Sequence, residues 1–467
     1  MTERKRTISN ELAATLILAG PVVFTQLAQT SLGFIDTIMV GRLGPDALAG
    51  VSLGNSIFFG TVVFGMGIMT AVTPMVSQAY GARDYDMVGR STRQGLWMGL
   101  IIGLLSMLIV RNASPVLLLL GLEPDMVALS RAYLHAISWG IPPFLWFVVL
   151  RGLVEGTSKP LPATAITWAG VLLNVGANYV LMYGKLGFPA LGLEGTGWAS
   201  SIVFWFTFLL LMLYCTRAAN VSALLQLVRL RTPDVTVFRE MFRIGWPIGA
   251  SFFLEAGLFM ITAILMGLFS TTAMAAHQVA IQCAAFTFMV PLGVGIAASV
   301  RVGQAVGRGD APGVRRAGVA GIGLAATFMF GTAMVFWLWP RTIVGLYLDL
   351  DMPQNQEVIR LAVVLLGVAA VFQIFDGVQV AAAGALRGLK DTRAPMVIGF
   401  ISYWLFGLST SWVLGFELEK GPQGLWWGLV TGLVVASSLL TVRFYRRSAD
   451  GTAFPLAVES GSANATA

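Results

Sequence analysis

Long apolar runs separated by short polar segments dominate the chain. One of them, Ile244–Phe269, extends over 26 residues and contains a single charged side chain, Glu255, close to its centre. A helix needs about 20 apolar residues to cross a hydrocarbon core, so this run is long enough to span a membrane. Backbone groups in lipid must bond to one another, which favours an all-α bundle. Twelve transmembrane helices are predicted, at Leu12–Met39, Ala47–Ala82, Gln94–Val110, Ala132–Leu150, Pro160–Gly184, Gly195–Thr216, Ile244–Phe269, Ser270–Val300, Ala317–Pro340, Leu361–Leu386, Ala394–Phe416 and Gly421–Val442.

The second half of the chain repeats the first. The motif Leu-Arg-Gly-Leu at 150–153 recurs at 386–389. Seven other residues recur at a constant spacing of 226, namely Pro21 and Pro247, Gly41 and Gly267, Gly67 and Gly293, Gln78 and Gln304, Gly81 and Gly307, Asp84 and Asp310, and Arg90 and Arg316. Each half holds an even number of spans, so both halves enter the membrane from the same side. Parallel repeats of this kind are common in secondary transporters.

The repeat sets the predicted domains. We expect a six-helix bundle at residues 1–216, a linker at 217–243 and a second six-helix bundle at 244–447. Within the linker, residues 223–230 are predicted to form a short helix at the membrane surface. The polar tail at 448–467 is expected to be disordered.

Composition and charge agree with this organisation. Hydrophobic residues make up 56% and charged residues 11%, with a mean hydropathy of +0.78, whereas soluble proteins carry about 25% charged residues. The net charge of +7 does not indicate a nucleic-acid partner, because the positive residues lie in the short segments between spans. With the N-terminus inside, the inner segments hold 23 of the 30 lysines and arginines. Both termini are therefore predicted to be cytoplasmic.

Only three acidic residues lie within the predicted spans, namely Asp36, Glu255 and Asp376. An ionised acid at the centre of a bilayer costs about 2.5–3.5 kcal/mol on insertion scales, so such residues are functional by default.

Asp36 has polar companions in the first bundle. Asn174 and Asn178 are four residues apart and share one face of a helix, and Thr196 starts the next span at similar depth. A carboxylate, two amide oxygens and a hydroxyl suit a hard cation such as Na⁺. The same group could hold a proton on Asp36, and the asparagines could instead join helices to each other.

Glu255 and Asp376 form the corresponding pair in the second bundle. Two neighbouring buried acids can hold one proton or one metal ion at neutral pH and release it when the site opens to water. Asp376 lies somewhat nearer the cytoplasmic side than Glu255, so the sequence does not require direct contact. At the repeat spacing, Gln29 takes the place of Glu255 and Thr262 that of Asp36. The two bundles are therefore not equivalent.

With these residues in view, the chain resembles the multidrug and toxic compound extrusion (MATE) family, in its bacterial NorM-like branch. The resemblance extends from about Leu12 to Tyr445. It is carried by PVVFTQLAQTSLGFIDTIMVGRLG (21–44), the LRG…P loops at 150–160 and 386–395, LNVGANYVLMYG (173–184), LEGTGWA (193–199), LEAGLF (254–259) and AAHQVA (275–280).

The resemblance implies a V-shaped pair of six-helix bundles in the bacterial inner membrane that exports cationic or amphipathic drugs against inward flow of Na⁺ or H⁺. It implies a cation site at Asp36, Asn174, Asn178 and Thr196, and a cation or substrate site at Glu255 and Asp376. Some relatives place a tyrosine hydroxyl beside the latter acids, whereas Phe288 and Phe372 stand at the nearby positions here.

Three function classes compete. A secondary antiporter, expected to be a monomer without cofactors, is favoured because one carboxylate can serve ion and cargo in turn. A lipid flippase of similar fold is the alternative, and it predicts a strongly basic cleft between the bundles. An enzyme is not expected, because the chain has no H-E-x-x-H motif, no G-x-x-x-x-G-K-[ST] motif and no soluble domain that would bind ATP.

Overall fold

A computed structural model describes residues 8–218, 221–222 and 234–449. The first half contains α1 (Ile8–Gly41), α2 (Pro45–Met69), α3 (Val72–Gly81), α4 (Tyr85–Arg111), α5 (Ser114–Leu119), α6 (Pro124–Ser138), α7 (Ile141–Gly156), α8 (Leu161–Tyr183) and α9 (Leu193–Arg217). The second half contains α11 (Val235–Phe269), α12 (Thr271–Gly307), α13 (Ala311–Leu338), α14 (Pro340–Val344), η2 (Pro353–Asn355), α15 (Gln356–Gly388), α16 (Arg393–Phe400), η3 (Ile401–Leu408), α17 (Ser409–Trp412), η4 (Val413–Glu417) and α18 (Gly421–Ala449). The helix predicted at 223–230 and residues 450–467 of the predicted tail lie outside the described residues. The first two residues of that tail, 448 and 449, belong to α18, and residues 235–243 of the predicted linker belong to α11.

The predicted all-α membrane fold is confirmed. Eleven of the described helices are long and apolar enough to cross a membrane, and α6 with α7 makes a twelfth span with a 46° bend. The bend falls at Trp139 and Gly140, just before Pro142 and Pro143 at the start of α7. Proline lacks the backbone N–H that would continue the preceding helix, which accounts for the break.

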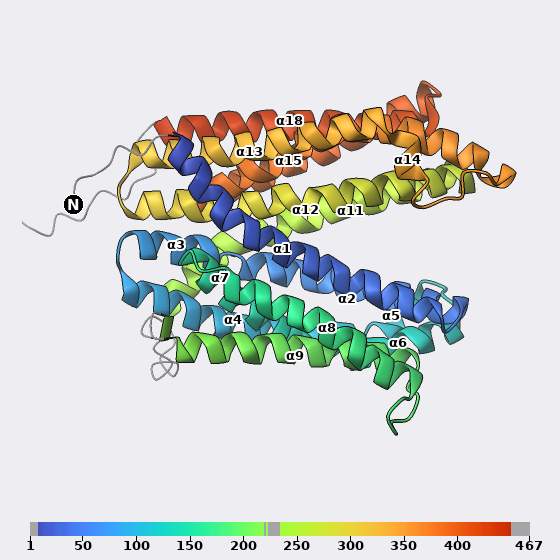
Figure 1. Ribbon diagram of the computed structural model, residues 1–467, viewed down its shortest axis with the longest axis horizontal. Helices are drawn as coiled ribbons and strands as arrows, with labels where there is room; N and C mark the ends of the chain where they lie inside the picture. Colours follow the sequence, from blue (N-terminus) through green and yellow to red (C-terminus); the bar gives the residue numbers. More distant parts are fainter. Residues whose placement is uncertain (1–7, 219–220, 223–233, 450–467) are drawn as a thin grey trace, which may run out of the picture.

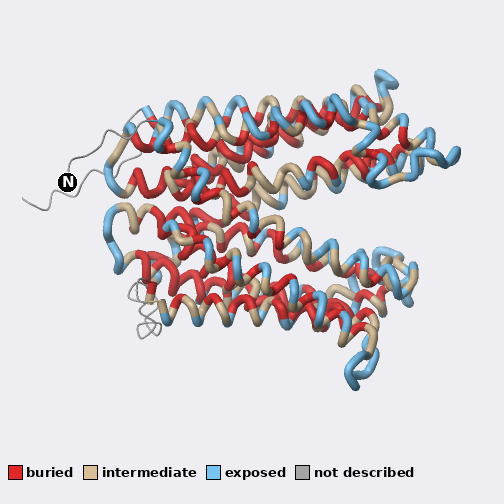
Figure 2. The backbone as a smooth tube through the Cα atoms, viewed as in Figure 1, coloured by how far each residue is buried: buried red, intermediate tan, exposed pale blue. Residues whose placement is uncertain are grey.

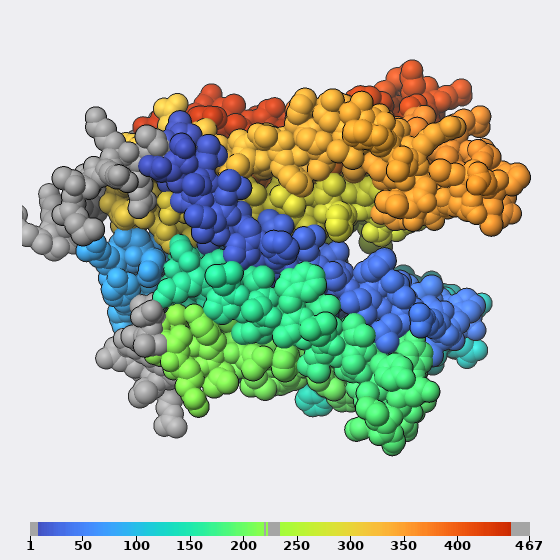
Figure 3. Space-filling model, viewed as in Figure 1, coloured from blue at the N-terminus to red at the C-terminus, as the bar shows by residue number. Residues whose placement is uncertain are grey.

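Two bundles lie side by side and diverge along their length (Figure 1). They meet at the end that holds the N-terminus, α3 and the start of α13, which we call the closed end. At the opposite, open end they part, and a hollow separates them on the molecular surface (Figure 3). Buried residues concentrate within each bundle and where the bundles meet (Figure 2).

The first helix of each half begins in the core of the other bundle. On α1, Leu18 and Ala19 pack with Val294 and Ala297 of α12. On α11, Met241 and its neighbours belong to the core of the first bundle. Both helices then cross to their own bundle, so each can transmit a change in one bundle to the other.

Paired residues of the repeat hold the closed end together. Gln78 Nε2 donates to the Gly388 carbonyl at 2.8 Å, and Gln304 Nε2 donates to the Gly156 carbonyl at 2.9 Å. Each bond runs from a glutamine of one bundle to the last residue of a helix in the other bundle, which is α15 for Gln78 and α7 for Gln304. The repeat seen in the sequence thus forms a pseudo-symmetric contact between the bundles.

Asp234 anchors the start of α11. Its Oδ1 accepts from the Thr236 and Val237 amides, at 3.1 and 3.2 Å, and its Oδ2 accepts from Arg90 Nε of α4 at 2.9 Å. The Arg90 guanidinium holds the pKa of Asp234 below its ordinary value. The stability that this pair contributes is therefore present above about pH 4 and lost as the pH falls through the lowered pKa.

Asp234→Ala is expected to lower the free energy of unfolding by about 1 kcal/mol, because α11 loses its N-cap as well as the ion pair. Asp234→Asn should cost less, because asparagine caps helices as well as aspartate does and an exposed ion pair contributes about 0–1 kcal/mol. Thermal unfolding of the two variants in detergent measures the difference. Equal loss in both would show that the cap contributes nothing.

Candidate cation sites in the two bundles

The polar group predicted in the first bundle surrounds Asp36. Asn174 and Asn178 of α8 each donate an amide N–H to Asp36 Oδ1, at 3.1 and 2.6 Å. Asn178 also donates to Asn174 Oδ1 at 3.2 Å. Their four-residue spacing places both amides on the face of α8 that packs against α1. Sequence reasoning therefore identified the core of this cluster.

Ser200, which sequence reasoning missed, completes the cluster. Its hydroxyl donates to Asp36 Oδ2 at 3.2 Å. The predicted member Thr196 is buried one turn earlier on α9 and donates to Met182 Sδ at 3.1 Å instead. The four-residue spacing of Thr196 and Ser200 was the available signal, because both lie on one helix face. Tyr133 of α6 is also buried within electrostatic range of Asp36.

One acceptor in this cluster is left without a partner. Asn178 Oδ1 is buried and has no hydrogen-bond partner. In this arrangement the cluster presents N–H and O–H donors to the Asp36 carboxylate, which suits an ionised acid. Rotation of an asparagine amide by half a turn would replace a donor by a carbonyl oxygen, and the same residues would then present oxygens to a cation.

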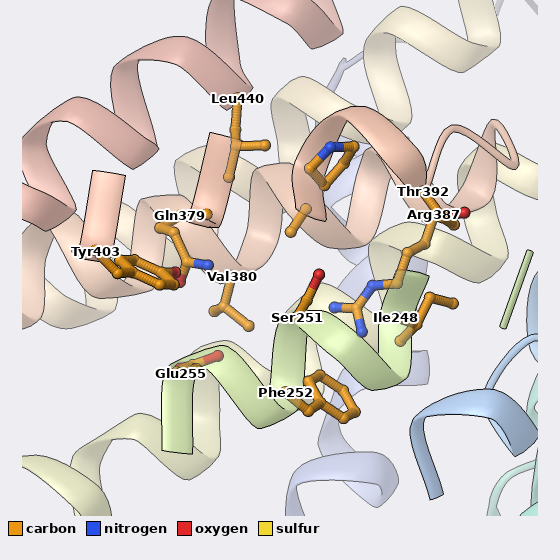
Figure 4. Close-up of a pocket in the computed structure, with 13 residues that line it drawn as sticks. Ile248, Ser251, Phe252, Glu255, Gln379, Val380, Arg387, Thr392, Tyr403 and Leu440 are labelled. Atoms are coloured by element: carbon orange, nitrogen blue, oxygen red, sulfur yellow. The ribbon is translucent and has the colours of Figure 1, made fainter. Parts of the chain in front are cut away.

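The second-bundle acid Glu255 lines a cavity between α11, α15 and η3 (Figure 4). Ser251 lies one turn before Glu255 on α11, while Gln379 and Arg387 enter from α15. Gln379 Oε1 is buried without a hydrogen-bond partner. The cavity therefore combines an acid, a base and an unpaired acceptor.

Asp376 is buried one turn before Val380 on α15 and lies within electrostatic range of Glu255. It is not among the residues that line the Glu255 cavity, and no hydrogen bond between the two carboxyl groups is found in the described part of the chain. The structure thus places the predicted pair in one region without direct contact.

Tyr403 is the second residue that sequence reasoning missed. It lies in the π-helical stretch η3, is 3% exposed, lines the Glu255 cavity and interacts electrostatically with Glu255 and Asp376. π-helical turns often occur at functional sites. Phe372 instead packs against Phe259 and Trp426, with ring centroids 6.2 and 5.5 Å away. The tyrosine beside these acids therefore comes from a different helix.

Two arginines that fall just outside the predicted spans lie within helices in the structure. Arg151 is near the end of α7 and Arg387 near the end of α15, and both line a cavity between the bundles together with Gln26, Gln29 and Glu155. Glu155, which sequence analysis placed outside the spans, is 3% exposed. The sequence did not reveal that these helices continue through the Arg-Gly motif, because the apolar runs end just before it.

The sequence profile of the MatE family matches residues 21–180 and 247–413, which together form most of the chain. The chain belongs to the MatE family. The predicted membership is thereby confirmed, and with it the prediction that this membrane protein is a transporter and not an enzyme. The two matched segments cover most of α1 to α8 and of α11 to α17, and they leave α9, the linker and α18 unmatched.

Relatives match the chain over nearly its whole length. A protein of Synechococcus sp. named "Probable multidrug resistance protein NorM" is 40% identical, with 96% of each chain covered. A protein of the same name from Rhizobium meliloti is also 40% identical, with 93% of each chain covered. Among solved structures, the eukaryotic MATE transporter AtDTX14 has a TM-score of 0.83 at 21% identity, covering 95% of this chain and 98% of that one. This last likeness supports the MatE fold alone.

Proposed function

We propose that this MatE protein is a secondary active multidrug efflux antiporter. It exports cationic or amphipathic organic compounds in exchange for Na⁺ or H⁺ by alternating access, as a monomer in the bacterial inner membrane. Both termini lie in the cytoplasm, as the distribution of lysine and arginine predicts. The closed end then faces the cytoplasm and the hollow opens outward.

The observation that carries the proposal is an acid in each of two bundles that contact each other at one end and part at the other. A carboxylate in such a place binds either a coupling cation or a cationic substrate. The two cannot bind to the same carboxylate at the same time. Competition for the acid then couples the two fluxes. The names of the relatives, multidrug resistance proteins, support the substrate class.

The arrangement around Asp36 supports either ion. Protonation would make Asp36 a donor, and the Ser200 hydroxyl beside Oδ2 could rotate to accept that proton. Sodium would require carbonyl oxygens, which Asn174 and Asn178 supply when their amides rotate. The cluster thus needs a local rearrangement in both cases. The relative affinities of the cluster for Na⁺ and for H⁺ decide which ion is coupled.

Proteoliposomes with a Na⁺ gradient or a pH gradient imposed separately test the proposal. Uptake of a fluorescent organic cation should accelerate under at least one gradient and stop when that gradient is dissipated. A protein that moves the cation at the same rate under no gradient, and no faster under either, would not be an antiporter of this kind.

A flippase is the second candidate, and one observation favours it, because Arg151 and Arg387 line the cavity between the bundles. However, Arg151 lies 3.5 Å from the Glu155 carboxylate, and Glu255 lies within electrostatic range of Arg387. The cavity is therefore not strongly basic. Transfer of a fluorescent anionic lipid between leaflets, independent of both gradients, would support the flippase instead.

A further inference from the structure

The two arginines of the repeated Arg-Gly motif have different partners. In the first bundle, Arg151 Nη1 donates to Gln26 Oε1 and Gln29 Oε1, at 3.1 and 3.0 Å. Its Nε lies 3.5 Å from Glu155, four residues later on the same helix. Arg151 thus has an acid partner within its own helix.

The second bundle keeps the same sequence spacing but not the same pairing. Asp391 follows Arg387 by four residues, as Glu155 follows Arg151. The helix ends at Gly388, however, and Asp391 turns to α18, where its Oδ2 accepts from Arg443 Nε at 2.7 Å and lies 3.7 Å from Arg447 Nε. Asp391 therefore pairs with arginines of α18 and not with Arg387.

Arg387 instead extends into the Glu255 cavity (Figure 4). Its side chain points toward α11, near Ser251, which lies one turn from Glu255. Its Nε is buried without a hydrogen-bond partner, and within the described ranges it forms no salt bridge. The guanidinium lies 5.9 Å from the centre of the Phe252 ring, and the acid that offsets its charge across this cavity is Glu255.

We propose that Arg387 is the resident counter-charge of Glu255, which the coupling cation or the cationic substrate must replace. The proposal rests on the antiport function above. While the site is empty, Arg387 compensates the ionised carboxylate from across the cavity. A cation that binds Glu255 competes with this tethered charge, so Arg387 lowers the affinity of the site and prevents an uncompensated acid between transport steps.

The closed end positions this arginine. The carbonyl of Gly388, the next residue, accepts the bond from Gln78 of the other bundle. The base of the Arg387 side chain is therefore held from the first bundle while the closed end is shut. Opening that end breaks the bond, so the strength of the counter-charge depends on the conformational state.

The other ionisable groups that face Glu255 are Asp376 and Tyr403, both buried. Asp376 carries the same charge as Glu255 and would oppose its ionisation. Arg387 is the cation within electrostatic range of Glu255 in the part of the chain that the structure describes. Arg360, which is exposed near the start of α15 and lines neither cavity, supplies the control.

The first test measures binding of tetraphenylphosphonium to the purified full chain at alkaline pH without Na⁺. Arg387→Gln is expected to tighten binding about tenfold, the size of effect that removal of one nearby charge produces. Arg387→Lys and the control Arg360→Gln should bind like the wild type. A gain in affinity separates this role from a structural one, because a damaged fold weakens binding. Unchanged affinity in Arg387→Gln, with weakened binding in Glu255→Gln, would overturn the proposal and leave the antiport function intact.

A second measurement follows proton binding without a drug. Trp404 Nε1 donates to the Leu254 carbonyl at 3.3 Å, next to Glu255. The chain has 13 tryptophans, so the part of the fluorescence that Trp404→Phe removes is the signal that reports on this acid. The pH midpoint of the fluorescence change is expected to rise by about one unit in Arg387→Gln, because the nearby positive charge that favours the ionised acid is removed. A midpoint equal to that of the wild type would contradict the proposal. If even the wild type shows neither drug binding nor cation dependence, the antiport function itself fails.

Stability supplies a third readout should Arg387→Gln fold poorly. Glu255→Gln leaves Arg387 without its counter-charge and is expected to unfold at a lower temperature than the double variant Glu255→Gln/Arg387→Gln. A double variant that is no more stable than Glu255→Gln would also overturn the proposal.

Discussion

Asp36→Asn is expected to slow cation-driven export at least about tenfold. The carboxylate accepts from Asn174, Asn178 and Ser200 and is the group on which a cation would bind. An interaction with a charged group contributes about 1.5–3 kcal/mol, so its loss should weaken cation binding at least about tenfold. Gradient-driven uptake of an organic cation into proteoliposomes measures the effect.

Asp46→Asn is the matched control for this variant. Asp46 lies in the first turn of α2 and is exposed to solvent, so its charge should not enter the transport cycle. Uptake by Asp46→Asn is expected at the wild-type rate. Normal uptake by Asp36→Asn, in protein that is folded and inserted, would remove the first-bundle cluster from the mechanism.

Gly307→Val is expected to prevent the closed end from shutting. A Cβ at Gly307 would overlap the Gln78 carbonyl oxygen, and a Cβ at the repeat partner Gly81 would overlap the backbone of Gln304. These are backbone atoms that cannot rotate away. Overpacking of this kind costs about 1–3 kcal/mol, which shifts a two-state equilibrium about 5- to 150-fold toward the state that is open at this end.

Distances between spin labels at Ala82 and Arg315, which are exposed at the closed end, report this shift. The native Cys215 and Cys283 are buried, which limits their labelling. Gly323→Ala on α13 is the control, because its Cβ would meet no atom within 4 Å. The same distance distribution in Gly307→Val and wild type would show that this contact does not limit closure.

The candidate sites were partly predictable. The acids were found because each stands alone in an apolar run, and the asparagines because a four-residue spacing fixes their common helix face. Ser200 and Tyr403 were not found, because small and aromatic polar residues are common in spans and carry no comparable cost. Which of them faces an acid depends on how each helix is rotated in the bundle.

The sequence by itself determined the helical membrane fold, the duplication and the acidic residues that are energetically costly to place within a membrane span. These follow from apolar run length, fixed spacing and the cost of burying charge, all of which are local properties of the chain. The tertiary structure alone decided the partners. Arg151 and Arg387 share a motif and each has an acid four residues later, yet only Arg151 pairs with it. One residue turns a helix by about 100°, so the residue at which α15 ends decides the direction of Asp391. Asp391 pairs with α18, and Glu255 is then the acid across the cavity from Arg387.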